Sequence, residues 1–291
     1  MLILLNAGFG DELGPQLLDE IKKLGFDGIR QDVVAMDAVR PLVSEVFEAG
    51  LFGLFVVNWG GVTAELAQEV ARVAEPMSRE FNVDYAIEIG NELNIAYPAQ
   101  RLGGIDIPAR AVVSPAAYGP AFVEIVDAIR RIDSLCNVVT AGISNTGKDA
   151  QRWIGSVNLQ GRPCTIGYHG YRTDDDPRPE APQKGFGSRD QEFDSLARIA
   201  AGRPLWNTEV GFHTAERRRG LFNHKKYRLS DAEATSYLRR ECDISRKHAV
   251  GLTCVFQLND GTRDEPEGRY GIRDVHGNWK PQAGVASWPR Q

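Results

Sequence analysis

The sequence predicts a single α/β domain, a (β/α)8 barrel that spans residues 1–291, and three observations lead to this prediction. Eight apolar runs lack a helical period, amphipathic stretches lie between them, and glycines follow the first two of those stretches. Strands that are apolar throughout and alternate with helices belong to a parallel sheet whose outer face is covered. Eight such units close most economically as a barrel.

The eight expected strands are Leu2–Leu5, Gly28–Val34, Leu51–Val57, Val83–Ile89, Asn137–Ala141, Cys164–Tyr168, Pro204–Thr208 and Gly251–Leu258. An open, doubly wound sheet is the main alternative, and it would require a glycine-rich phosphate-binding turn after an early strand. The first strand is followed by AGFGDELG, which lacks the GxGxxG spacing. The barrel is therefore the preferred fold. Its last helix is expected to be short, because residues 271–291 contain an HGN turn.

Helix signals lie between the expected strands. Gly25 and Gly50 follow the first two amphipathic faces and suit C-terminal caps. Ser230 with Glu233 forms a capping box that starts a later helix. Pro76 is expected either to kink or to end the third helix.

Composition argues against several classes of function. The net charge of −5 provides no overall attraction to nucleic acid or to an anionic membrane. No apolar run approaches the roughly 18 residues that span a bilayer. MLILL reads as the first core strand, so the chain is expected in the cytoplasm, or outside the cell if a signal peptide has been removed. The four cysteines form no CxxC pair and are expected as free buried thiols.

Two glutamates occur in matching settings. Glu92 lies in IEIGNELN and Glu209 lies in PLWNTEVGF, and each ends an apolar run that a loop follows. A buried carboxylate is costly unless it is paired or its pKa is shifted, so two of them on separate strands indicate a paired-carboxylate catalytic site. The alternative is that each glutamate is satisfied by a neighbouring arginine or by a helix N-terminus.

Further polar residues also end the apolar runs, and the carboxyl ends of barrel strands are where active sites form. The residues expected to bind substrate or to support the two glutamates are Arg30, Asn58, Trp59, Asn91, His169, Tyr171, Asn207 and Gln257.

At these residues the chain resembles the retaining glycoside hydrolases of clan A, a (β/α)8 group that includes cellulases, mannanases, β-xylosidases and β-galactosidases. In that clan an Asn-Glu pair ends the fourth strand and a second Glu ends the seventh, as in GNELN and WNTEVGF here. The resemblance implies that Glu92 is the general acid/base and that Glu209 is the nucleophile. GIRQD, YHGY and YGIRDVHGNWKPQ resemble further motifs of the clan, in the same order.

The resemblance also implies supporting roles. Arg30 of GIRQD and Tyr171 of YHGY would contact the nucleophile, and Asn91 would bond the 2-hydroxyl of the sugar. Many relatives end the eighth strand with a tryptophan under the reacting sugar, whereas this chain has VFQLND, which offers Phe256 and Gln257. The residue beneath the central sugar therefore stays open.

The chemistry explains why these residue types are needed. A retaining glycosidase uses one protonated and one ionised carboxyl group about 5–5.5 Å apart. Arg30 and Tyr171 would keep the pKa of Glu209 low, and the negative field of Glu209 would raise that of Glu92. No metal or other cofactor is expected.

Other aromatic residues and histidines have weaker assignments. Trp59 is expected to stack on a sugar face, whereas strand alternation points Trp206 outward, beneath the helices. His169 is expected as a supporting hydrogen-bonding residue rather than a catalyst. His213 and His224 are assigned to a solvated basic loop.

Two loops are expected to border the cleft. Residues 172–190 are polar and rich in Pro and Gly, and they are expected to form a wall. Residues 216–228 are strongly basic, for which solvated surface is the default interpretation. Binding of a uronate or sulfate group is the alternative.

We therefore expect a retaining β-glycoside hydrolase that acts on an oligosaccharide, a polysaccharide or a simple glycoside. One alternative is a carbohydrate-binding barrel without catalytic activity. Another is a metal-assisted hydrolase or lyase, but among the strand ends only His169 offers a histidine ligand. The sequence names neither the sugar nor the linkage, and it does not decide between endo and exo action.

Overall fold

The computed structural model describes residues 1–7, 13–97, 99–102, 105–107, 109–171, 188–214, 229–261 and 268–288. The predicted barrel is confirmed, with eight parallel strands in the order β7-β4-β3-β2-β1-β10-β9-β8. Its strands are β1 (Leu2–Ala7), β2 (Gly28–Val33), β3 (Phe52–Val57), β4 (Tyr85–Asn91), β7 (Asn137–Gly142), β8 (Ile166–His169), β9 (Leu205–Val210) and β10 (Leu252–Phe256). The ring closes between β7 and β8, where Thr140 N donates to Thr165 O at 2.9 Å and His169 N donates to Ile143 O at 2.9 Å.

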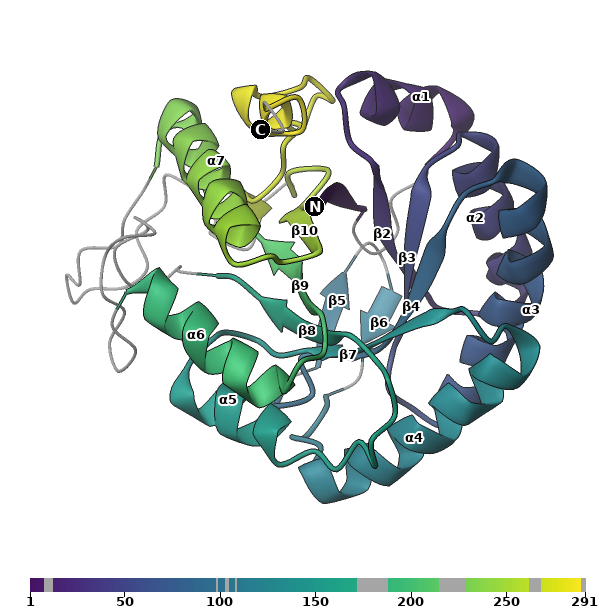
Figure 1. The fold of residues 1–291 in the computed structure, drawn as a ribbon. Helices are drawn as coiled ribbons and strands as arrows, with labels where there is room; N and C mark the ends of the chain where they lie inside the picture. Colours follow the sequence, from purple (N-terminus) through teal and green to yellow (C-terminus); the bar gives the residue numbers. More distant parts are fainter. Residues whose placement is uncertain are drawn as a thin grey trace.

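Helices cover the outside of this ring (Figure 1). Those in the described residues are α1 (Pro15–Lys23), α2 (Met36–Glu48), α3 (Thr63–Phe81), α4 (Pro115–Ile132), α5 (Lys148–Gly155), α6 (Arg189–Ala200) and α7 (Asp231–Lys247). The prediction of a short last helix is confirmed, because the last helix in the described residues is the 3-10 helix η2 (Pro281–Val285), which packs against α7. A hairpin of β5 (Gln100–Leu102) and β6 (Ile105–Ile107) leaves the barrel after β4. In the described segments no helix is long and apolar enough to span a membrane.

Most of the predicted helix signals operate as expected. Gly25 and Gly50 follow α1 and α2 with φ of +95° and +67°, in the left-handed conformation that glycine tolerates best. Ser230 accepts a hydrogen bond from Glu233 N and completes the capping box of α7. Pro76 lies inside α3 and does not end it.

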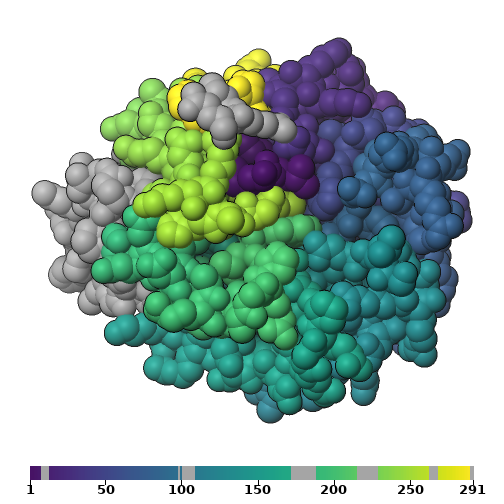
Figure 2. Space-filling model, viewed as in Figure 1, coloured from purple at the N-terminus to yellow at the C-terminus, as the bar shows by residue number. Residues whose placement is uncertain are grey.

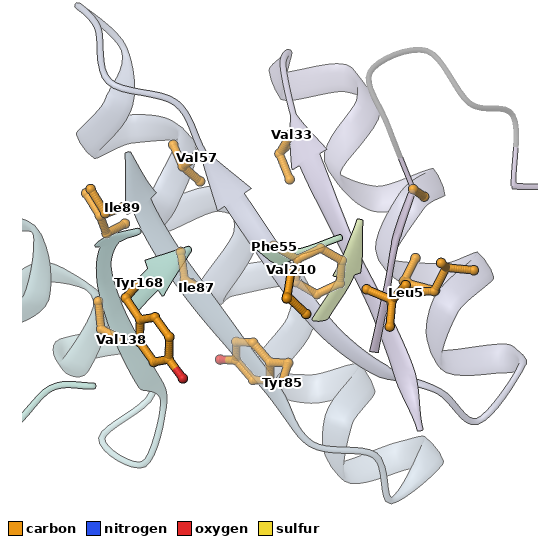
Figure 3. Close-up of a cluster of buried hydrophobic side chains, with 14 of the residues drawn as sticks. Leu5, Val33, Phe55, Val57, Tyr85, Ile87, Ile89, Val138, Tyr168 and Val210 are labelled. Carbon is orange, nitrogen blue, oxygen red and sulfur yellow. The ribbon is translucent and has the colours of Figure 1, made fainter. Parts of the chain in front are cut away.

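Two apolar layers hold the barrel together. The outer layer lies between strands and helices, and Figure 3 shows part of it, with Phe55, Ile87 and Tyr168. The inner layer fills the barrel where the strands begin, and it consists of Leu4, Leu54, Ala86, Val139, Trp206, Leu252 and Cys254. Figure 2 shows this end of the molecule, with the N-terminal residues enclosed at its centre. The polar interior is therefore confined to the opposite end, where the strands finish.

The prediction that Trp206 points outward is wrong. A β-bulge interrupts β9, because Tyr168 of β8 pairs with Asn207 while the next residue, His169, pairs with Glu209. The additional residue breaks the strict alternation of the strand, so that Trp206 and Glu209 both face the barrel interior. Trp206 meets Phe52 edge-on there, with 6.1 Å between ring centroids.

Two further predictions have clear outcomes. All four cysteines are free and buried, as predicted: Cys136, Cys164, Cys242 and Cys254. His213 is buried rather than solvated, because its ring stacks on Phe212 at 5.2 Å, which corrects its assignment to a surface loop. Residues 215–228, which include His224 and the basic segment, lie outside the described residues, and so do residues 172–187.

Candidate active site

The polar end of the barrel brings the two glutamates together. Glu92 directly follows β4 and is 7% exposed, and Glu209 lies on β9 and is 6% exposed. One carboxylate oxygen of each lies within 4.8 Å of the other and of His169 Nδ1. Residues 117 positions apart in the sequence thus form one compact group.

Three side chains surround the Glu209 carboxylate. Arg30 Nη1 donates to Oε1 at 2.6 Å, the Tyr171 hydroxyl donates to Oε2 at 2.7 Å, and Asn6 Nδ2 lies 3.5 Å from Oε1. Burial opposes the charged form, but the positive fields of His169 and Arg30, together with these hydrogen bonds, outweigh it and lower the pKa of Glu209. Glu209 is therefore ionised at neutral pH.

Glu92 has a different environment. It directly follows β4 on left-handed backbone with φ of +48°, and its N–H donates to Gly142 O at 2.9 Å. In the part of the chain that the structure describes, its carboxyl group has one hydrogen-bonded side-chain partner, His169, whose Nδ1 lies 2.7 Å from Oε1. The two glutamates therefore differ in the number and the charge of their partners.

His169 lies between the two carboxyl groups. Its Nδ1 is 2.7 Å from Glu92 and 3.5 Å from Glu209 Oε2. Gly142 makes room for the fully buried ring, since a Cβ there would come within 2.3 Å of His169 Nε2. Burial lowers the pKa of His169, but the negative field of Glu209 and the hydrogen bond with Glu92 outweigh it and raise the pKa above its ordinary value.

Glu92, His169 and Glu209 are also the kind of group that could hold a metal ion. Both oxygens of Glu209 already accept hydrogen bonds, from Arg30 and from Tyr171. A metal ion would have to compete with both donors, so the donor set suits an organic substrate better than a resident cation.

A third buried glutamate was missed in the sequence. Glu88 is fully buried and accepts hydrogen bonds from Arg30 Nε at 2.7 Å, Gly142 N at 3.0 Å and Thr208 Oγ1 at 3.2 Å. It lies on β4 four residues before Glu92. A charged residue inside the apolar run IEIG was the available signal, because alternation places it on the inner face.

Asn91, Asn58 and Trp59 lie around the mouth in different settings. Asn91 Oδ1 accepts a hydrogen bond from Arg30 Nη2 at 3.0 Å. Asn58 Nδ2 donates to Asp32 Oδ1 at 2.9 Å. Trp59 is half-buried, and its ring centroid lies 5.1 Å from that of Tyr118. One side of Trp59 therefore already packs on the protein.

Asn207 and Gln257 make contacts with backbone groups. Asn207 is fully buried, and its Oδ1 accepts a hydrogen bond from Gly170 N at 3.0 Å, close to Arg189. This hydrogen bond fixes the backbone of the YHGY segment at Gly170. Gln257 is half-buried and follows a cis peptide bond after Phe256, and its backbone N–H donates to Tyr270 O at 3.3 Å.

Comparisons with known proteins are consistent with this architecture. No protein-family model matches the chain, and no curated protein matches its sequence. Among solved structures, it is similar to the cellulose synthase subunit Z of Clostridioides difficile, with 13% identity and a TM-score of 0.63 over 99% of this chain and 98% of that one.

Two further solved structures are similar over nearly the whole length. A fungal β-1,4-galactanase has 12% identity and a TM-score of 0.63, with 99% of each chain covered. An active-site mutant of the β-1,3-glucanosyltransferase of Rhizomucor miehei, in complex with laminaritriose, has 11% identity and a TM-score of 0.61 over 97% of this chain and 96% of that one. The chain therefore has the same (β/α)8 fold as these carbohydrate-active proteins.

Proposed function

We propose that the protein is a retaining β-glycoside hydrolase in which Glu209 is the nucleophile and Glu92 the general acid/base. The observation that carries the proposal is a pair of buried carboxyl groups, with oxygens within 4.8 Å, in unequal surroundings. Retaining enzymes place their carboxyl groups about 5–5.5 Å apart, whereas inverting enzymes leave about 6.5–9.5 Å for a water molecule. The observed spacing supports retention.

In the first step Glu209 attacks the anomeric carbon and the bond to the leaving oxygen breaks. Arg30 and Tyr171 keep Glu209 ionised and oriented for this attack. Glu92 gives its proton to the leaving oxygen, which completes the alcohol that departs. The product of this step is a glycosyl ester of Glu209.

In the second step Glu92 acts as a base rather than as an acid. Glu209 is now a neutral ester, and Glu92 is a carboxylate that can accept a proton from water. Attack of that water on the anomeric carbon releases the sugar with retained configuration and restores both glutamates. His169 Nδ1, 2.7 Å from Glu92, stays in hydrogen-bonding contact with the group that loses and regains the proton.

A carbohydrate-binding barrel without catalytic activity is the alternative. The site provides a specific argument against it, because Glu88, Glu92 and Glu209 are all buried in one region. Ionisable groups are costly to bury close together, and a binding site gains nothing from this cost. The similar solved proteins include one in complex with laminaritriose, which supports an oligosaccharide as the substrate class.

Chemical rescue tests the two roles. The activity is first found with 4-nitrophenyl β-glycosides of glucose, galactose, xylose, mannose and glucuronic acid, and with β-1,3- and β-1,4-linked oligosaccharides. The preferred substrate is then given to Glu209→Gly and Glu92→Gly, with and without sodium azide. Glu209→Gly should lose roughly 10⁴-fold or more in kcat. Azide should restore its turnover and give the glycosyl azide of inverted configuration.

Glu92→Gly should behave differently. With an activated leaving group it should still form the glycosyl–enzyme, and azide should then give a product of retained configuration. Exchanged azide products would reverse the two assignments. Wild-type protein that binds the oligosaccharides but turns over no substrate of the panel would instead favour the binding barrel.

A further inference from the structure

A single arginine, Arg110, donates hydrogen bonds to the backbone at Glu92. Arg110 follows the β5–β6 hairpin, in the segment that leads to α4. Its Nη1 donates to Asn91 O at 2.6 Å, and its Nη2 donates to Glu92 O at 2.7 Å. One guanidinium group therefore binds two successive carbonyl groups at the end of β4.

The backbone at this point needs such support. Gly90 and Glu92 have φ of +86° and +48°. Gly90 adopts this conformation without penalty, but a residue with a side chain holds it only where its surroundings impose it. The hydrogen bond from Glu92 N to Gly142 O fixes the peptide group before Glu92, and the bond from Arg110 fixes the one after it. The direction of the Glu92 side chain follows from these two peptide planes.

Arg110 is itself fixed on the opposite side. Its backbone pairs with that of Tyr97 through two N–H···O bonds of 2.8 Å. Its guanidinium group lies over the Tyr97 ring, 5.1 Å from the centroid, in a cation–π arrangement. Arg110 thus connects the segment around Tyr97 to the end of β4.

We propose that Arg110 is a positioning residue for the general acid. This inference rests on the proposed role of Glu92. Arg110 contacts the main chain of Asn91 and Glu92, and through it sets the direction of the Glu92 carboxyl group toward His169 and the glycosidic oxygen. Removing the Arg110 guanidinium group should therefore impair proton donation by Glu92 and leave the attack by Glu209 intact.

Leaving-group dependence separates these two effects. Arg110→Met removes both donors and the charge, while Arg110→Lys keeps the charge. Arg130→Met is the matched control, because Arg130 also donates to a backbone carbonyl, Pro163 O at 2.6 Å, but on an exposed surface. The substrates are the phenyl and the 2,4-dinitrophenyl β-glycosides of the sugar that the wild-type enzyme prefers. Phenol needs a proton to leave, whereas dinitrophenolate does not.

Arg110→Met should lower kcat/KM for the phenyl glycoside by about 10- to 100-fold, since a misplaced general acid loses much of its effect. For the dinitrophenyl glycoside the loss should stay within about 3-fold, because general acid catalysis contributes little there. Arg130→Met should change neither value. For the phenyl glycoside, the kcat/KM of Arg110→Lys should lie between the values of the wild-type enzyme and of Arg110→Met.

Glu92→Gly, measured in parallel, distinguishes the two ways of failing. If Glu92→Gly shows no leaving-group dependence, the proposed function itself is wrong. If Glu92→Gly shows it but Arg110→Met loses activity equally on both substrates, or on neither, the positioning role is overturned. Circular dichroism checks the fold of each variant, and if Arg110→Met does not fold, the same comparison with Arg110→Lys decides.

Discussion

Replacing Asp32 by asparagine should change the pH dependence of stability by an amount that can be worked out from the structure. Asp32 lies on β2, two residues after Arg30, and accepts a hydrogen bond from Asn58 Nδ2 at 2.9 Å. Burial raises the pKa of Asp32 from 3.8 to about 6; Arg30 opposes this shift, and the negative field of Glu209 adds to it. The folded state therefore binds the Asp32 proton more tightly than the unfolded state does.

The sign and the size follow from linkage. Because the folded-state pKa is the higher one, the contribution of Asp32 to stability is fully present below pH 3.8 and is lost as pH rises through about 6. A difference of about 2 pKa units at 1.36 kcal/mol each corresponds to about 3 kcal/mol. Asparagine cannot ionise, and its Oδ1 can still accept the bond from Asn58. The Asp32→Asn variant should therefore not lose this stability as the pH rises.

Urea unfolding of the wild-type protein and of Asp32→Asn, at pH values from 4 to 8, provides the measurement. The difference in the free energy of unfolding between the two should grow by about 3 kcal/mol over this range, in favour of the variant. Asp149→Asn is the control, because the Asp149 side chain is 95% exposed, and its difference from wild type should stay nearly constant. A difference for Asp32→Asn that is also independent of pH would refute the reasoning.

Two more predictions concern charged residues. Glu88→Gln should slow formation of the glycosyl–enzyme by about 10-fold, because Arg30 would become a buried charge without a charged partner when Glu209 is esterified. The rate of dinitrophenolate release in the first turnover measures this step, and an unchanged rate would contradict the prediction. Replacing Arg217, Arg218 and Arg219 of the basic segment by serine should raise KM for a uronate-containing substrate and remove its dependence on ionic strength, because exposed charges are screened over about 8 Å at physiological salt. Unchanged kcat/KM for every substrate would leave the segment as solvated surface.

The barrel could be predicted because its strands are continuous apolar runs. β3 and β9 begin one residue later than the predicted strands, and β4 begins two residues later, at Tyr85. β4 also runs two residues further than predicted, to Asn91, which places Glu92 directly at its end. The hairpin β5–β6 was not predicted, although Gly103 and Gly104 between two short β-type runs are a turn signal. A strand of three residues is too short for a periodicity argument.

The contacts within the site were less accessible from the sequence. Strand alternation was extrapolated backward from Glu209, but a β-bulge cannot be recognised in the letters of PLWNTEVGF. The position of His169 between two glutamates depends on that same bulge, since it pairs His169 with Glu209 rather than with Thr208. Arg110 was not identified because it contacts the main chain of Asn91 and Glu92, and main-chain contacts leave no pattern of residue types.

The buried Glu88 has a possible use in the reaction proposed for Glu92 and Glu209. Arg30 is buried and bonds Glu88 and Glu209 at the same time, at 2.7 Å and 2.6 Å. In the proposed reaction Glu209 loses its charge each time the glycosyl ester forms, and a lone buried guanidinium would then be strongly destabilised. Glu88 takes no part in that bond change and remains 2.7 Å from Arg30 Nε. Under this proposal Arg30 can stabilise ionised Glu209 without becoming an isolated buried charge when the ester forms.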